Sequence, residues 1–470
     1  MSKYKIDILD EVHCKANAKA RSVIKFALGY KAMHWRRGEW AMESNVVRQF
    51  LITGRKGTSG HFLTGLLPRI ERYCAKRMID LEINGDREFL QPQKKPHLPD
   101  ITFRKDQQRH LRKLANTQRG KIIAPTGSGK TIIQFGLASM FPNANILLLA
   151  HTTDLINQLI AESGRFQLSL PPIYYPTGKD ECKRIMEAIA RDNNGSLIIT
   201  TIQSFSKVPP ALYSTTVDIA MVDECHHVAN LDGQYGKFFH YLLAPRRYGF
   251  TASDQKMDRK IKLINEGLLG PVIAKLTVQE GIKLGIIAKP KVKLINVPYD
   301  VKINQSCHRY TDFYTKGIVR NKKRNESIRK IVNMNVGKKR ATLIIVEKLE
   351  HGKILSDLIS RRSKVKVHFI SGSTKQNIRQ KFKQRLLDGK IFALVVSRIW
   401  MEGINIPNLR AVIYAAGMKE QKRTIQAMGR GFRTTKTKKK ILLYDFLDPY
   451  KYLSSHSIER MHVYNREKWL

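Results

Sequence analysis

One segment of the chain has the residue types and spacing that phosphate chemistry requires. Ala124-Pro-Thr-Gly-Ser-Gly-Lys-Thr131 follows an apolar run and precedes a helical stretch, which is the context of a phosphate-binding loop. Its glycines let backbone N–H groups approach and point at phosphate oxygens. Lys130 would reach the β- and γ-phosphates of a nucleoside triphosphate, and Thr131 would place its hydroxyl on Mg²⁺. The expected nucleotide contacts are Pro125, Thr126, Gly127, Ser128, Gly129, Lys130 and Thr131.

A pair of acids follows a second apolar run. Asp223 and Glu224 directly follow the apolar residues 219–222. A carboxylate at the C-terminal end of a parallel strand lies beside a phosphate-binding loop. We expect Asp223 to hold Mg²⁺ and Glu224 to orient or deprotonate the attacking water. A surface acidic pair is the alternative. Zinc at Cys225 and the two following histidines is disfavoured by their spacing, and we expect His226 to couple the triphosphate site to nucleic acid.

A third group supplies cations. Arg430 and Arg433 are three residues apart, so on a helix they share one face. Across a closed cleft they would stabilise charge on the transferring phosphoryl group, as arginine fingers do, with Gln426 on the same face. A solvated basic helix is the alternative interpretation.

The elements that must position these groups come in two series. Short β-branched or Leu-rich runs at 121–124, 145–150, 196–200 and 218–223 alternate with helical stretches, as expected for parallel strands buried on both faces. A second series occupies 341–346, 365–370, 392–396, 411–416 and 441–446. The sequence therefore predicts two successive α/β domains, and residues 286–298 read as a connector between them.

The first 100 residues read as a small α+β unit, closed by the Pro-rich polar linker 91–100. The predicted organisation is an accessory, DNA-binding domain, an ATP-binding domain, a second α/β domain and a short basic helix. Their limits are 1–95, 101–287, 288–450 and 451–470.

Taken in order, these segments resemble the motifs of superfamily 2 helicases. The matching blocks are 103–107, 124–131, 147–159, 198–205, 223–226, 249–253, 369–374, 395–407 and 426–433. The resemblance implies two tandem RecA-like domains of the P-loop NTPase class, with ATP and Mg²⁺ as cofactors. It also implies that Arg104 and Gln107 read the adenine, and that Gly403 belongs to the nucleotide site. Contacts to backbone phosphates are implied for Thr152, Thr201 and Gln203.

The whole-chain layout looks most like the UvsW-type phage recombination helicases, near the XPB and RecG-like translocases. That resemblance implies branch migration, fork regression and unwinding of branched DNA or R-loops in recombination, repair and replication. Two residues depart from the family pattern, Ser253 and His151.

The charge of the chain favours a polyanion as partner. Lys and Arg number 84 against 39 Asp and Glu, a net charge of +45. Residues 291–470 hold 41 basic and 13 acidic residues, a net charge of +28. This excess suggests that the second α/β domain and the C-terminal helix bind duplex or a second DNA arm. A solvated basic surface is the alternative.

Aromatic and basic residues interleave near the N-terminus. Such groups stack on bases or contact phosphates, although Trp35 and Trp40 also suit a hydrophobic core. The nucleic-acid candidates here are Arg36, Arg37, Arg55 and Lys56.

Other features bound the class of protein. No run of about 18 apolar residues predicts a membrane span, no secretory signal is evident, and the five cysteines are widely spaced. We therefore expect a cytoplasmic, monomeric, ATP-dependent DNA helicase or translocase, in the bacterial host's cytoplasm if the chain is a phage protein. The alternatives are an RNA helicase, a duplex translocase that does not separate strands, and a nucleotide-switched nucleic-acid-binding scaffold.

Overall fold

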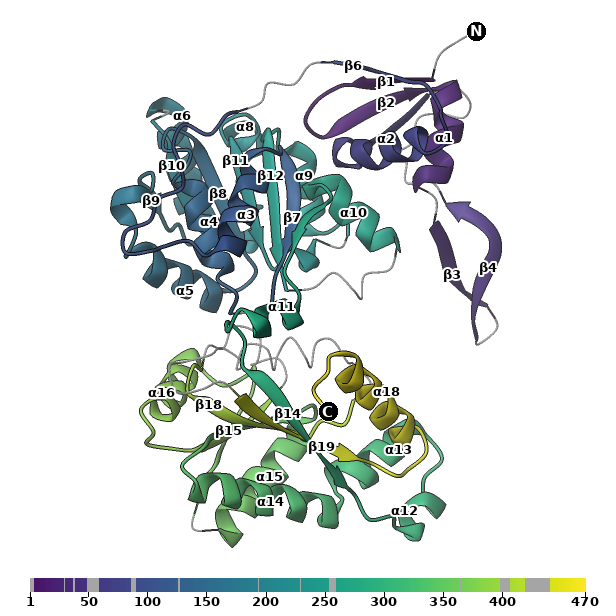
Figure 1. The fold of residues 1–470 in the computed structure, drawn as a ribbon, viewed down its shortest axis with the longest axis vertical. Coiled ribbons are helices and arrows are strands. Elements are labelled where there is room, and N and C mark those ends of the chain that lie inside the picture. Colours follow the sequence, from purple (N-terminus) through teal and green to yellow (C-terminus); the bar gives the residue numbers. More distant parts are fainter. Residues whose placement is uncertain are drawn as a thin grey trace. The chain divides into compact units, whose positions relative to one another are not determined.

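In a computed structural model, the chain forms two compact units that are described separately below (Figure 1). The first comprises Met1–Ala124 and Gly129–Leu276, and the second comprises Pro125–Ser128 and Thr277–Leu470. The structure describes all residues except 1–3, 29, 37–38, 49–58, 86–89, 126, 193, 229, 253–258, 364, 398–405 and 419–439. The predicted domain limits at residues 95, 287 and 450 stay predictions.

The first unit opens with a four-stranded mixed sheet in the order β5-β2-β1-β6. Its strands are β1 (Tyr4–Ile8), β2 (His13–Asn17), β5 (Ser59–Leu63) and β6 (Leu81–Asn84). The sheet packs on α1 (Ala18–Leu28) and α2 (Leu67–Ala75) (Figure 1). An antiparallel pair, β3 (Tyr30–Arg36) and β4 (Glu39–Arg48), sets Trp35 opposite Trp40. The predicted α+β character of this segment is confirmed.

The same unit contains a parallel seven-stranded sheet in the order β13-β7-β12-β11-β8-β10-β9. The strands at its centre are almost wholly apolar because helices cover both faces. The strands are β7 (Arg119–Ile123), β8 (Asn145–Ala150), β9 (Ile173–Tyr174), β10 (Ser196–Thr201), β11 (Ile219–Asp223), β12 (Arg246–Thr251) and β13 (Val272–Lys275). The helices that matter for the site are α3 (Lys105–Ala115), α4 (Lys130–Ala138), α5 (Thr153–Ser163), α7 (Ile202–Phe205) and α10 (Arg259–Leu269).

The second unit is built on a parallel six-stranded sheet in the order β14-β19-β18-β15-β17-β16. The strands are β14 (Lys289–Asn296), β15 (Ala341–Val346), β16 (His368–Ile370), β17 (Ala393–Ser397), β18 (Leu409–Tyr414) and β19 (Lys440–Leu447). Its longer helices are α14 (Lys322–Gly337), α15 (Leu349–Arg362), α16 (Gln376–Leu387) and α18 (Leu453–Arg466). The two parallel sheets are of RecA type, which confirms the predicted α/β fold class with two tandem RecA-like domains.

The connector predicted at 286–298 is wrong. Residues 289–296 form β14, which pairs in parallel with β19 along its whole length. Pro290 and alternating lysines made this segment look like a linker. An edge strand tolerates both, because one of its sides has no strand partner.

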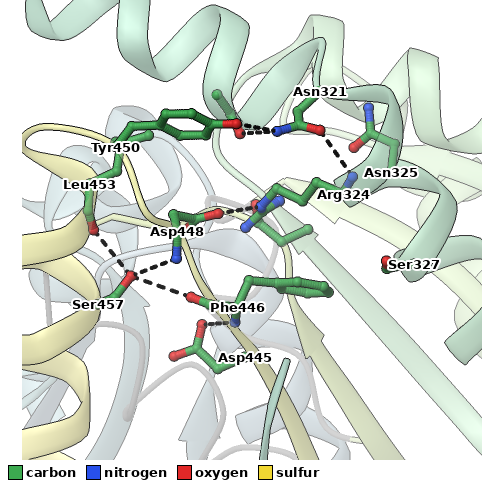
Figure 2. A network of polar contacts seen from close by, with 12 residues as sticks. Asn321, Arg324, Asn325, Ser327, Asp445, Phe446, Asp448, Tyr450, Leu453 and Ser457 are labelled. Atoms are coloured by element: carbon green, nitrogen blue, oxygen red, sulfur yellow. Dashed lines mark hydrogen bonds and ion pairs between the residues drawn. The ribbon is translucent and has the colours of Figure 1, made fainter. Parts of the chain in front are cut away.

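Buried ion pairs fasten α14 and the last helix, α18, to the second unit, and Figure 2 shows the pair between Arg324 and Asp448. Arg324 of α14 donates to Asp448 at 2.8 Å and to the Ala415 carbonyl at 2.9 Å. Arg460 of α18 donates to Asp445 at 2.7 Å. Because buried charges are tolerated only when paired and hydrogen-bonded, Arg460 has a structural role in holding α18 on the sheet.

No helix within the described residues is long and apolar enough to cross a bilayer.

Candidate functional site: an ATP site at the carboxyl edge of the first parallel sheet

The phosphate loop has the backbone conformation that its glycines predict. Gly127 and Gly129 have φ angles of +83° and +87°, which residues with a Cβ rarely adopt. Gly129 directly precedes α4, so the first N–H groups of that helix face the loop. Lys130 is 9% exposed, and its Nζ donates to the Ala124 carbonyl at 3.2 Å. This ammonium is held at the loop by a neutral acceptor.

The expected adenine-reading residues lie against this loop. Arg104 and Gln107 form a capping box at the start of α3, in which the Arg104 N–H donates to Gln107 Oε1 at 3.1 Å. The Gln107 amide nitrogen is so close to Gly129 that a Cβ there would lie 2.6 Å from it. Asp106 accepts from the Arg104 guanidinium at 3.0 Å, which fixes the direction of that side chain.

The acid pair lies at the end of β11, of which Asp223 is the last residue. Asp223 and Glu224 are 9% and 6% exposed, and Gln134 of α4 donates to Asp223 at 3.4 Å. Glu224 has φ +49° and ψ +47°, a left-handed conformation that costs a non-glycine residue roughly 1–2 kcal/mol. Local strain of this kind concentrates at functional sites, and the surrounding turn must hold it in place.

A row of imidazoles leads away from Glu224. His226 Nδ1 lies 3.4 Å from Glu224 Oε2 and 3.1 Å from the Thr251 hydroxyl at the end of β12. The His227 ring stacks on His151, with centroids 3.7 Å apart and 9° between the planes. Gln203 donates to the His151 carbonyl at 3.4 Å. The row therefore joins groups at the ends of β12, β11, β8 and β10.

The strand order shows that this row of side chains runs across the sheet. From β7 to β10 the sheet runs β7-β12-β11-β8-β10, and strands spaced about 4.8 Å apart cover roughly 19 Å in four steps. Lys130 follows one end of this series, and Thr201 and Gln203 follow the other. A triphosphate and a nucleic-acid strand bound at these two ends would be linked through protein side chains.

Two of the expected nucleic-acid contacts are helix caps. The Thr152 hydroxyl accepts from the Leu155 N–H at 3.3 Å, and the Thr201 hydroxyl accepts from the Ser204 N–H at 3.2 Å. Parallel pairing sets Thr201 opposite Ala150, so the two caps lie side by side at one edge of the sheet. The Thr152 hydroxyl can still donate its own proton to a phosphate, whereas the Thr201 hydroxyl donates to the Ser204 hydroxyl at 3.1 Å.

Several predicted site residues cannot be placed. Arg36 ends β3, and its side chain is not described. Outside the described residues lie Arg37, Arg55, Lys56, Thr126, Gly403, Gln426, Arg430 and Arg433.

Sequence reasoning missed a buried polar cluster behind the acid pair. Asn265 of α10 donates to the carbonyls of Cys225 and Val228 at 2.6 and 3.2 Å, and accepts from Lys121 at 2.7 Å. Lone Asn and Lys residues far apart in sequence carry no motif that could have revealed it. Burial raises the pKa of the Cys225 thiol to about 12, so this cysteine is a packing residue beneath the turn.

A phosphate loop, an acid pair two strands away and two parallel sheets of RecA type define a P-loop NTPase motor. Comparison with protein families agrees. The family described as type III restriction enzyme, res subunit, matches residues 100–255, and the helicase conserved C-terminal domain matches 323–435.

Individual relatives point the same way. The chain is 24% identical over 385 residues to the ATP-dependent DNA helicase UvsW of Enterobacteria phage T4, covering 73% of this chain and 71% of that protein. It is 23% identical over 412 residues to the DNA 3'-5' translocase XPB2 of Sulfurisphaera tokodaii, covering 80% and 88%. The Hef helicase domain of Pyrococcus furiosus shares the fold, with a TM-score of 0.51 at 14% identity, over 76% of this chain and 97% of that one. The chain belongs to the superfamily 2 helicases and is an ATP-dependent, nucleic-acid-binding enzyme.

Proposed function

We propose that this helicase is a DNA translocase that acts on branched DNA, by branch migration, fork regression or unwinding of R-loops and D-loops. The observation that carries the proposal is the row of side chains from Glu224 through His226, His227 and His151 to Gln203. Such a row is suited to a motor whose hydrolysis responds to the strand it holds. The preference for DNA is supported by the DNA helicase and DNA translocase among its relatives.

In the proposed chemistry, the chain's own groups position the triphosphate and activate water. Lys130 and the N–H groups around Gly129 bind the β- and γ-phosphates. Glu224, buried and fixed by its turn, orients the attacking water and accepts its proton. Arg104 and Gln107 hold the base against the loop.

The residues present also fit Mg²⁺. A hydroxyl at Thr131 and a carboxylate at Asp223 are the oxygen ligands that this ion takes beside phosphate oxygens, and the Gln134 amide orients that carboxylate. When bound, Mg²⁺ supplies charge neutralisation at the β- and γ-oxygens.

The arginine fingers complete the proposal. Arg430 and Arg433, with Gln426 and Gly403, are proposed to meet the γ-phosphate when the two RecA-like domains close on ATP. Opening after hydrolysis would then move the protein along its strand. We propose that one copy of the chain is sufficient for this cycle, and that it acts in the cytoplasm that holds its DNA.

The decisive experiment compares the ATPase rate across a panel of nucleic acids: single strand, duplex, fork, four-way junction, R-loop and RNA. Forks, junctions or R-loops should stimulate hydrolysis more than linear duplex of equal length, and a strand-displacement assay should show unwinding. Greater stimulation by RNA would favour an RNA helicase. Stimulation by duplex without strand displacement would favour a duplex translocase that does not separate strands, and binding without turnover would favour a nucleotide-switched scaffold.

A further inference from the structure

The N-terminal sheet with α1 and α2 (the N-terminal segment, between Tyr4 and Asn84) contacts the ATP-binding part of the first unit (between Lys105 and Lys275) at very close range. The contact joins η1 (Thr64–Leu66) to α10, the helix that also supplies Asn265. A Cβ added at Gly65 would lie 2.5 Å from the Glu266 and Gly267 carbonyl oxygens, and one at Gly267 would lie 2.6 Å from Leu63. Backbone therefore packs directly on backbone, and small shifts on one side are transmitted to the other.

Two ion pairs flank this contact. Arg69 of α2 pairs with Glu266 of α10, with Nε 3.1 Å from Oε1 and Nη2 2.5 Å from Oε2. The Glu266 side chain is 8% exposed. Glu11 pairs with Arg119 of β7, and both side chains are largely buried. Each pair thus ties the N-terminal segment to one element of the ATP-binding part.

These two elements, α10 and β7, also hold the turn that follows Glu224. Asn265, next to Glu266, is 1% exposed and donates to the Cys225 and Val228 carbonyls. Lys121, two residues after Arg119 on β7, donates to Asn265 Oδ1 at 2.7 Å. The amide of Asn265 is therefore fixed at both ends and clamps the 3-10 turn Cys225–His227.

We propose that the N-terminal segment is a positioning element for ATP hydrolysis, which acts through Arg69, Glu266 and Asn265 on the turn that sets the conformation of Glu224. Glu224 sits in a left-handed conformation, which persists only where its surroundings over-determine it. A nucleic acid that moves the N-terminal segment would thereby alter hydrolysis. This inference rests on the role proposed above for Glu224.

The test measures kcat and KM for ATP in the full chain at saturating single-stranded DNA. Asn265→Ala should lower kcat by about tenfold, which is about 1.4 kcal/mol in the activation barrier, with KM for ATP changed less than twofold. Arg69→Ala should lower kcat by a smaller factor, also with KM unchanged. In the double variant, the Arg69→Ala effect should vanish, because both changes act on the same turn.

Arg72→Ala is the matched control. Arg72 is an exposed arginine on the same helix, and its guanidinium donates to the Pro68 carbonyl of that helix at 3.0 Å. Its loss removes the same charge without touching α10, so kcat should stay at the wild-type value. Exchanging the partners, in Arg69→Glu with Glu266→Arg, should recover part of the lost kcat.

Several results would overturn the inference. Arg69→Ala behaving like Arg72→Ala would do so even if Asn265→Ala fails to fold, and so would additive losses in the double variant. Glu224→Gln separates this failure from that of the proposed function. If Glu224→Gln keeps turnover, the catalytic assignment itself is wrong. If it loses turnover while Arg69→Ala does not, only the positioning role is wrong.

Discussion

At the scale of single residues, the site depends on charged groups held in unusual surroundings. Lys130 and Glu224 are both nearly buried, and Glu224 is in a left-handed conformation. Each of these groups can therefore be tested by a single substitution that removes its charge.

The first prediction concerns these two groups. Lys130→Ala and Glu224→Gln should each lower DNA-stimulated ATP hydrolysis by at least about a hundredfold, because the first removes a cation at the phosphates and the second removes the general base. Fluorescent ATP-analogue binding should weaken in Lys130→Ala but remain in Glu224→Gln, since the amide keeps the shape of the carboxylate. Near wild-type turnover in either variant would contradict the assignment of this site.

The second prediction concerns the stacked imidazoles. His227→Ala removes the ring that lies 3.7 Å from His151, whereas His227→Phe keeps a flat ring there. The ratio of DNA-stimulated to basal ATPase should fall severalfold in His227→Ala and stay close to wild type in His227→Phe, with basal ATPase similar in all three proteins. Equal losses in both variants would mean that the imidazole acts through its nitrogen atoms and not through stacking.

At the scale of elements, the sequence predicted those elements that residues close together in the chain specify. A glycine-rich loop between an apolar run and a helical stretch leaves few alternatives, so the order of β7, the loop and α4 was predictable, and so was the placement of Asp223 at a strand end. β14 was not, because its pairing with β19 joins residues about 150 positions apart. The Asn265 cluster was not predictable for the same reason, since tertiary packing alone brings Lys121 and Cys225 to it.

A buried histidine gives the helices of the second unit a pH-dependent stability. His351 of α15 is fully buried, and its Nε2 lies 2.9 Å from Asn325 Oδ1 on α14. Since Asn325 Nδ2 already donates to Val319, the histidine is the donor. Burial, reinforced by the charge of Arg324, lowers the pKa of His351 to about 3, against about 6.5 in an unfolded chain.

The third prediction follows from the sign of that shift. Between pH 6.5 and 3 the unfolded chain binds a proton that the folded chain does not, so stability falls with falling pH by up to about 1.4 kcal/mol per pH unit. His351→Gln keeps an N–H donor and does not titrate. Its melting temperature should therefore fall less than that of the wild type between pH 7 and pH 5. Parallel falls in the two proteins would exclude this contribution.

At the scale of the whole molecule, the distribution of charge is the feature that the motor chemistry leaves unexplained. Residues 291–470 carry a net charge of +28, and the motor needs only a few cations at its phosphates. Part of this charge is structural, as Arg324 and Arg460 show. Part is on the surface: β14 exposes Lys289, Lys291 and Lys293 (the β14 lysine row), on alternate residues and hence on one face of the strand.

The fourth prediction tests whether the β14 lysine row contacts DNA phosphates or is only solvated surface charge. The logarithm of the duplex affinity should fall with the logarithm of salt concentration, with a slope of about −0.9 for each phosphate neutralised. If the β14 lysine row binds phosphates, replacing its three lysines by Gln should make the slope shallower by about 2 to 3. The matched control replaces the exposed Lys322, Lys323 and Lys330 of α14, which changes the net charge equally. Equal changes in both triple variants would assign the effect to the overall field of the protein, and a wild-type slope near −1 would mean that most of the +28 is solvated surface.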